Sequence, residues 1–371
     1  MSDSVMIPFN DLNSMRRALS DELNEAIRRV VDSGWYILGP EVERFESEFA
    51  AFHGGGTAVG VANGTDAIEL ALRAAGIGHG DEVITVSHTA VATVCAIERA
   101  GAKPILVDID PVTLTMDPMA AAAAVSPRTR ALVAVHLYGH PADMDALTKL
   151  ADRCGLLLVE DCAQAHGARY KGQLVGTFGR LAAFSFYPTK NLGAYGDGGA
   201  VLTRDAALAD RLRRLRNYGQ TERYRHVERG VNSRLDEMQA AILGVKLAHL
   251  NVHNVERRKI ANMYRQNFVG MEHPVAADEI EHVFHLYVVR FPHRDALRIR
   301  LRSEGMETQI HYPTPIHLQP AYVDLGYAEG SLPVTEQAVV TILSLPMYVG
   351  IDMEAIVRVA RSFNSPFRKA A

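Results

Sequence analysis

The sequence predicts an α/β protein built on a mostly parallel sheet with helices on both faces. Through the first 205 residues, short β-rich segments alternate with helical patterns. Most of these segments are continuous apolar runs, as expected of strands that are buried on both faces. After about residue 205 the alternation ends and helical patterns dominate. With 371 residues, the chain is long enough for a large domain and a second, smaller one.

The elements of the first part follow in a regular order. The segments that predict strands are 58–61, 82–86, 103–107, 131–136, 156–161, 181–186 and 199–203. Helices fit between them. Four apolar residues have the 3-4-3 spacing of one helical face, namely Val42, Phe45, Phe49 and Phe52. Residues 66–75 favour a helix that stops at Gly76, a residue type that commonly ends helices.

The C-terminal part has a different pattern. One long amphipathic helix is predicted by the spacing of Leu235, Met238, Ile242 and Val245. The elements expected beyond it are a helix over 256–268, a strand over 285–291, a helix over 295–304 and an extended, proline-broken stretch over 307–320. We therefore expect a large domain over residues 1–250 and a smaller domain over residues 251–371.

Composition and charge exclude several classes of function. The formal net charge of −4 gives no electrostatic basis for binding nucleic acid or an anionic membrane. Cys95, Cys154 and Cys162 are too few and too scattered for a disulfide framework or a zinc site. No apolar run approaches the roughly 18 residues of a membrane span, and the N-terminal residues lack the pattern of a signal peptide. A cytoplasmic enzyme is the expectation.

The most informative residue is Lys190, which ends the segment 185–190 and precedes the glycine-rich 196–199. Upstream, Asp161 closely follows an apolar run. Enzymes that use pyridoxal phosphate need such a pair, because a lysine amine forms a Schiff base with the cofactor aldehyde and a carboxylate holds the pyridinium proton. Asp161 could instead be a solvated strand-end carboxylate, whereas a buried one needs a cation. Gln164 could donate a hydrogen bond to the cofactor's phenolate oxygen.

A phosphate site is predicted where a strand joins a helix at residues 63–66. Glycine lets the backbone approach an anion, and the first N–H groups of a helix point at it. The alternative is an ordinary helix cap, with Asn63 or Thr65 as the capping residue. In combination with Lys190 and the hydroxyl of Ser185, the phosphate interpretation is the better one.

The histidines leave one question open. His88 follows a predicted strand, and its ring could lie over a cofactor or serve only the structure. His136, His140 and His166 have a spacing that matches no metal-ligand pattern, so we expect no metal.

Six segments together carry a resemblance to a known family: 34–42, 62–67, 107–110, 160–167, 185–199 and 230–241. Over nearly its whole length the chain resembles the pyridoxal-phosphate-dependent sugar-nucleotide aminotransferases of the DegT/DnrJ type. The resemblance implies the fold-type-I aminotransferase architecture, in which helices sandwich a mostly parallel sheet and a smaller α+β domain follows. It also implies that Lys190 is the Schiff-base lysine and that Asp161 pairs with the pyridine nitrogen.

Further roles are implied by the resemblance. Gln164 neighbours the ring hydroxyl, and the phosphate is held by Gly64, Thr65 and Ser185. Asn232 reaches the phosphate of the neighbouring subunit's cofactor, which implies a homodimer with shared active sites. Many members have an aromatic residue that stacks on the cofactor where Ala90 stands here. His88 takes that role in our hypothesis.

The segments 36–39 and 311–322 look most like the subgroup that aminates C3 of a dTDP-linked 3-oxo-6-deoxyhexose for deoxyamino sugar biosynthesis, with L-glutamate as donor. The residues expected to contact the substrate are Tyr36, Tyr187, His311, Tyr312, His317 and Tyr322. The alternative for the rings in 311–322 is that they only pack the domain.

Other functions stay open on the sequence alone. Within the family, the acceptor could be C4 of the sugar or a keto-inositol. From another class, the chain could be a non-catalytic regulatory protein that keeps the fold, which the intact Lys190, Asp161 and Asn232 disfavour. Lys190 also argues against the branch in which histidine replaces the lysine and the reaction is a dehydration.

Overall fold

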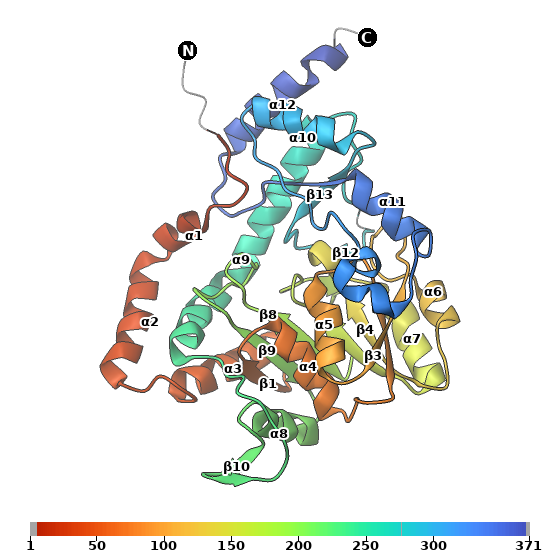
Figure 1. Cartoon of the computed structure of the whole chain (residues 1–371). Coiled ribbons are helices and arrows are strands. Elements are labelled where there is room, and N and C mark those ends of the chain that lie inside the picture. The colour runs from red at the N-terminus through yellow and green to blue at the C-terminus, as the bar shows by residue number, and fades with distance from the viewer. Residues whose placement is uncertain (1–5, 276, 369–371) are drawn as a thin grey trace.

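The computed structural model of this protein describes residues 6–275 and 277–368. A central sheet is formed by β1 (Thr57–Val61), β2 (Glu82–Val86), β3 (Lys103–Val107), β4 (Thr129–Val135), β5 (Leu157–Asp161), β8 (Leu181–Ser185) and β9 (Gly199–Thr203). Its seven strands have the order β1-β9-β8-β5-β4-β2-β3 (Figure 1). Only β9 runs against its neighbours, and the remaining pairs are parallel. The prediction of a mostly parallel sheet is confirmed.

Helices cover both faces of this sheet. They are α3 (Pro40–Phe52), α4 (Gly64–Ala74), α5 (Val91–Arg99), α6 (Pro118–Ala123), α7 (Met144–Cys154), α8 (Ala206–Leu215) and α9 (Glu237–Asn267). The helices α1 (Leu12–Ala18) and α2 (Ser20–Ser33) stand away from the sheet, and α2 packs against α9 (Figure 1). Alternate residues of β8 point to opposite faces. Ala182 and Phe184 pack with α3 and α9, whereas Leu181 and Ala183 pack with α4. This burial on both faces explains why the strands are continuous apolar runs.

The prediction of a separate helix over 256–268 was wrong, because α9 is one uninterrupted helix of 31 residues. The polar residues near its middle interrupted the apolar pattern without ending the helix. Asn254 is 2% exposed; its side chain accepts a hydrogen bond from Asn191 at 2.9 Å and donates one to the carbonyl of His166 at 2.8 Å. Residue 250 lies inside α9, so the division of the chain into domains at that residue stays a prediction.

The C-terminal part packs around a core of its own. β13 (Tyr287–Arg290) pairs antiparallel with β14 (Ile342–Leu345). The other elements of this part are α10 (Arg294–Ser303), α11 (Pro333–Thr341), α12 (Met353–Arg368) and two 3-10 turns at Ile316–Leu318 and Pro320–Leu325. Tyr264, Phe268 and Tyr287 belong to its buried cluster, so the C-terminal half of α9 is part of this core.

Short strands lie outside the central sheet and the β13–β14 pair. β12 (Ile280–Glu281) pairs with β6 (Arg169–Tyr170), which pairs with β7 (Gln173–Leu174). β10 (Gln220–Glu222) and β11 (Arg225–His226) form a hairpin that projects from the body at the bottom of Figure 1.

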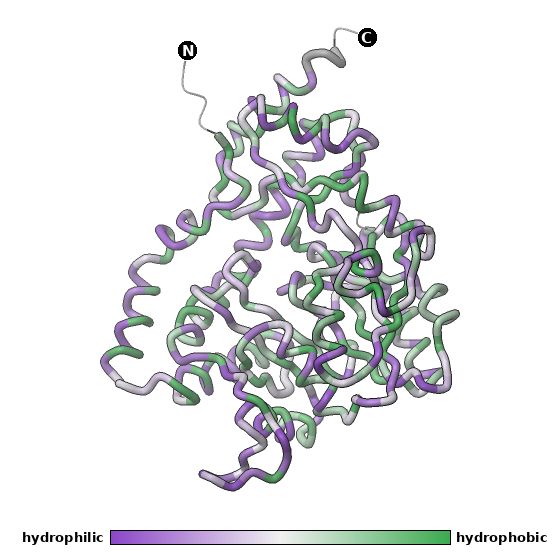
Figure 2. Tube along the Cα trace, viewed as in Figure 1, coloured by the Kyte–Doolittle hydropathy of each residue, from purple (hydrophilic) through white to green (hydrophobic). Residues whose placement is uncertain are grey.

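The amphipathic pattern of an outer helix determines which of its faces packs against the protein. Polar and apolar residues alternate along α2, at the left of Figure 2. Its buried residues, Leu23, Ala26 and Val30, fall on one face, and Leu23 packs with Ile242 of α9. Within the described residues, no helix combines the length and the apolar character that crossing a membrane requires.

Candidate active site

One cavity of about 240 Å³ lies at the carboxyl ends of the parallel strands. Open α/β sheets bind ligands at this edge. Residues that follow β1, β2, β5 and β8 form most of its wall. The predicted site residues that line it are Gly64, Thr65, Asp161, Gln164, Ser185, Tyr187 and Lys190. The fold therefore brings together residues from three distant parts of the chain.

Lys190 reaches the cavity from the loop that follows β8. Its backbone N–H donates to the carbonyl of Tyr187 at 2.9 Å, which closes a tight turn. Gly193 keeps this loop compact, because a Cβ there would lie 2.5 Å from the carbonyl oxygen of Pro188. Burial lowers the pKa of the Lys190 amine to about 8, and the charge of Asp161 opposes that change. Near physiological pH the neutral fraction of this amine is therefore well above that of an ordinary lysine, although the charged form still predominates.

Asp161 is the last residue of β5 and is 4% exposed. Its Oδ2 accepts a hydrogen bond from the Thr93 hydroxyl at 2.8 Å, and its Oδ1 accepts one from the Ala163 N–H at 3.1 Å. Burial raises the pKa of this carboxyl, while both hydrogen bonds and the charge of Lys190 lower it. A carboxylate that lines a cavity at this depth suits a cationic ligand group.

The turn from β1 into α4 forms another wall. Asn63 caps the helix, because its Oδ1 accepts from the Asp66 N–H at 2.8 Å. The capping interpretation of Asn63 therefore holds, and it leaves Gly64 and Thr65 free to line the cavity beside Ser185. Only glycine fits at Gly64, since a Cβ there would lie 2.6 Å from the Cβ of Ser185. This close approach forms a cradle at a helix N-terminus, where an anionic phosphate is favoured.

Gln164 connects the cavity to the proline-broken stretch. Its Nε2 donates to the Tyr312 hydroxyl at 3.2 Å, and its Oε1 accepts from the Tyr138 N–H at 2.7 Å. Tyr312 is partly buried just beyond the cavity wall. His311 lies beside it, stacks on Phe9 and bonds the Ser344 hydroxyl through Nδ1 at 2.9 Å. Burial lowers the pKa of His311 to about 4, so the ring is neutral.

His88 does not line the cavity, whereas Ala90 does. The His88 ring is 1% exposed, and its Nε2 lies 2.8 Å from the Tyr138 hydroxyl. Burial lowers its pKa to about 4. This geometry favours the structural interpretation of His88, and its role over a cofactor stays a prediction.

The other predicted substrate and cofactor residues separate into two groups. Tyr36, Tyr187 and Asn232 are exposed, Tyr36 to 51% and Tyr187 to 53%. In contrast, His317 is 2% exposed, and its ring bonds Ser87 at 2.7 Å and Glu336 at 3.0 Å.

Tyr322 belongs with the second group. It is 8% exposed and packs in an apolar cluster with Val94 and Leu106. For His317 and Tyr322, the packing alternative therefore describes the observed surroundings.

Two features of the site leave no signal in the sequence. A threonine in the first turn of a helix, such as Thr93, has no distinctive pattern. The side chains of His136, Glu160 and Cys162 lie close enough together to share a metal ion. These residues lie at or next to the ends of the neighbouring strands β4 and β5. The Glu160 carboxylate there already accepts hydrogen bonds from His136 at 3.1 Å and from three backbone N–H groups.

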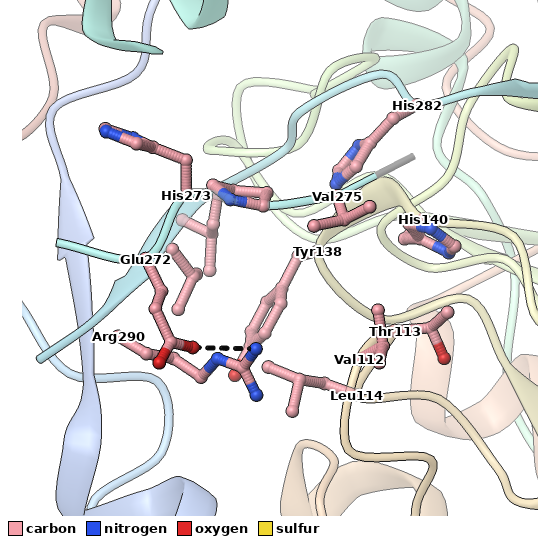
Figure 3. Close-up of a pocket in the computed structure, with 13 residues that line it drawn as sticks. Val112, Thr113, Leu114, Tyr138, His140, Glu272, His273, Val275, His282 and Arg290 are labelled. Atoms are coloured by element: carbon pink, nitrogen blue, oxygen red, sulfur yellow. Dashed lines mark ion pairs between the residues drawn. The ribbon is translucent and has the colours of Figure 1, made fainter. Parts of the chain in front are cut away.

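A second, much smaller cavity of about 30 Å³ is shown in Figure 3. It lies between residues 112–114 and the C-terminal part, where Glu272 pairs with Arg290 at 2.9 Å. His140 and His282 meet edge to face at its rim, with ring centroids 5.3 Å apart. The cavity shares no residue with the first one and has room for little more than water.

Over most of its length the chain matches a known family. The model of the DegT/DnrJ/EryC1/StrS aminotransferase family matches residues 17–364. The dTDP-3-amino-3,4,6-trideoxy-alpha-D-glucose transaminase of Streptomyces venezuelae is 51% identical over 361 residues, which are 96% of this chain and 95% of that protein. The erythromycin biosynthesis sensory transduction protein EryC1 of Saccharopolyspora erythraea is 51% identical over 352 residues, which are 94% of this chain and 96% of that protein.

Solved structures show the same architecture. DesV of S. venezuelae, in complex with a ketimine intermediate, has 50% identity and a TM-score of 0.93 over 96% of this chain and 99% of that one. NtdA of Bacillus subtilis, with bound cofactor PMP, has 29% identity and a TM-score of 0.91 over 98% of this chain and 85% of that one.

Proposed function

Because the chain belongs to the DegT/DnrJ/EryC1/StrS aminotransferase family, we propose that it transfers an amino group from L-glutamate to the C3 keto carbon of a dTDP-linked keto-6-deoxyhexose. It is an aminotransferase, and pyridoxal phosphate is its cofactor. The observation that carries the proposal is that Lys190 and Asp161 line one cavity, next to a glycine cradle at a helix N-terminus.

The residues of the cavity fit the cofactor. Pyridoxal phosphate, when bound, supplies an aldehyde that condenses with amines and a ring that withdraws electrons from the reacting carbon. The Lys190 amine would anchor the aldehyde, and the buried Asp161 carboxylate would hold the proton on the ring nitrogen. The cradle of Gly64, Thr65 and Ser185 would take the phosphate.

Lys190 is also suited to move a proton. A general base works best when its pKa lies near the working pH. The lowered pKa of about 8 would let Nζ take up a proton from the carbon of the amino donor and deliver it to the cofactor. The same residue would therefore serve as anchor and as base.

The keto-sugar acceptor is supported by the relatives and by the cavity wall. The S. venezuelae relative, at 51% identity, is a transaminase named for a dTDP-3-amino sugar. Tyr187 lines the cavity, and the Tyr312 hydroxyl is bonded to Gln164 on its wall. We propose that Tyr36, Tyr187, His311 and Tyr312 contact the sugar nucleotide. His317 and Tyr322 would hold the segment in place from the interior.

We propose that the enzyme is a cytoplasmic homodimer in which Asn232 completes the partner's site. Exposed large apolar residues support an interface, because a lone soluble chain seldom gathers many on its surface. Exposed examples near the cavity and the Asn232 segment are Trp35, Tyr36, Ile37, Tyr187, Tyr195 and Tyr218. Asn232 itself is exposed, and its backbone pairs with Asn217.

The regulatory alternative is testable with one substrate. A relative named as a sensory transduction protein shares 51% identity, so similarity alone does not separate the two functions. Incubating the cofactor-loaded protein with L-glutamate should convert the cofactor to its amine form, which changes its absorption spectrum. A regulator should leave the spectrum unchanged, and Lys190→Ala is the matched control. Acceptors with a keto group at C4, or keto-inositols, test the other family functions.

A further inference from the structure

A pair of buried hydroxyl groups lies beside the Asp161 carboxylate, on two threonines that also line the cavity. Thr93, in the first turn of α5, donates to Asp161 Oδ2 at 2.8 Å. Thr89 Oγ1 lies 3.0 Å from Thr93 Oγ1. The exposed fractions are 1% for Thr93 and 4% for Thr89, so water does not compete for these bonds.

We infer that Thr93, backed by Thr89, is a positioning residue that fixes the Asp161 carboxylate for its contact with the cofactor ring nitrogen. This inference rests on the proposed function, because that function makes the ring nitrogen the partner of Asp161. Because Thr93 itself lines the cavity, the test below separates an effect through Asp161 from a direct contact with the cofactor.

The bond directions support this role. A carboxylate has about four lone-pair positions on its two oxygens. The Ala163 N–H occupies one on Oδ1 and the Thr93 hydroxyl one on Oδ2, and the carboxylate also lines the cavity. Because the two donors bind different oxygens, they fix the rotation of the carboxyl group. Ala163 lies two residues from Asp161 in the chain, so among the described residues it is Thr93 whose hydrogen bond ties the group to α5.

A purely structural role would not need the hydroxyl. Valine has nearly the same shape, and a buried hydroxyl is costly unless its hydrogen bond is made. Thr85, on β2 of the central sheet, is another buried threonine that gives a comparison. It is 0% exposed, and its hydroxyl donates to the backbone carbonyl of Val133 at 3.1 Å rather than to a carboxylate. Thr85→Val therefore removes a buried threonine hydroxyl without changing the surroundings of Asp161.

The test measures cofactor affinity rather than turnover. The apoprotein forms of Thr93→Val, Thr93→Ser and Thr85→Val would be titrated with pyridoxal phosphate. Hydrogen bonds to charged groups are the stronger ones in proteins, so Thr93→Val should weaken binding by about 10-fold. Thr93→Ser should restore it to within about 2-fold, and Thr85→Val should leave it unchanged. Thr93→Ala serves as a second variant if the valine protein does not fold.

The same titrations in an Asp161→Asn background separate positioning from packing. If Thr93 acts through the carboxylate charge, Thr93→Val should cause little further loss there. Wild-type affinity in Thr93→Val, or an equal loss in both backgrounds, would overturn the inference. If Asp161→Asn by itself leaves affinity and spectrum unchanged, the proposed ring-nitrogen contact fails as well. If Asp161→Asn lowers the affinity but the Thr93 variants leave it unchanged, the inference about Thr93 is wrong while the proposed function stands.

Discussion

Lys190 and Asp161 line one cavity, and each alters the proton affinity of the other. The carboxylate raises the pKa of the amine and the ammonium lowers that of the carboxyl, but burial acts in the opposite direction on both and is the larger effect. The outcome is an amine with a pKa of about 8 beside a carboxylate held by two hydrogen bonds. Such a pair suits a site that must bind an aldehyde covalently and a cationic ring at once.

The lowered pKa of Lys190 predicts how cofactor attachment depends on pH. Only the neutral amine attacks the aldehyde, so the rate of attachment to the apoprotein should rise with pH, with a midpoint near 8, and then level off. Asp161→Asn removes the charge that raises this pKa, so its midpoint should lie lower. Rapid-mixing absorption measurements across pH would show both. A midpoint near about 10.4, the value of an ordinary lysine, would contradict the assigned desolvation.

Asp161→Asn should strongly reduce turnover while the fold is kept. Without the carboxylate charge the cofactor ring withdraws electrons less well, so turnover should fall by about 100-fold or more, which corresponds to roughly 3 kcal/mol in the barrier. The amide keeps the shape of the side chain but loses the charge that holds the ring proton. Asp145→Asn is the control, because that residue only pairs with Lys171 on the surface. Near-normal transamination by Asp161→Asn would refute the pyridinium contact.

Shared active sites predict complementation between inactive subunits. Lys190→Ala and Asn232→Ala should each be inactive alone, since one lacks the anchor and the other lacks the proposed contact with the partner's cofactor. A mixed dimer contains one site with both wild-type residues, so partial activity should return after subunit exchange. No recovery, with exchange proven by differently tagged chains, would count against the arrangement in trans.

The proline-broken stretch should separate the two half-reactions. Tyr312→Phe and His311→Ala should weaken amination of the sugar and spare the reaction with glutamate, because sites that hydrogen-bond a substrate hydroxyl discriminate strongly. His317→Ala is the matched comparison: its buried ring bonds Ser87 and Glu336, so its main effect should be a lower Tm. Single-turnover spectra with each substrate measure the difference. Equal losses in both half-reactions would reassign Tyr312 to the cofactor or to the structure.

Much of the fold could be predicted because strands buried on both faces leave a simple sequence pattern. β2, β3 and β9 begin and end at the predicted residues, and the remaining sheet strands differ by one or two residues at their ends. The long helix α9 was divided because a buried polar residue, Asn254, looks like a surface residue in sequence. Only its two partners in space reveal that it lies inside.

The site could be predicted where residues follow strands, and less well elsewhere. Asp161, Ser185 and Gly64 lie at strand ends or helix starts, so topology alone brings them to one edge. The sequence could not distinguish the buried His317 from Tyr312 of the same stretch. Aromatic residues in an irregular segment look alike in sequence whether they lie near a cavity or in the core. Thr93 became visible only through its distance to Asp161.

The most direct test of the proposed function follows nitrogen from donor to acceptor. The loaded enzyme would be incubated with nitrogen-labelled L-glutamate and a dTDP-linked 3-oxo-6-deoxyhexose, and the product analysed by NMR and mass spectrometry. We expect one labelled amino group at C3 of the sugar, and no labelled product with Lys190→Ala. Preferential amination of the 4-keto isomer would contradict the C3 assignment. Failure to aminate any keto-sugar nucleotide, by a protein whose cofactor accepts the glutamate nitrogen, would contradict the proposed function itself.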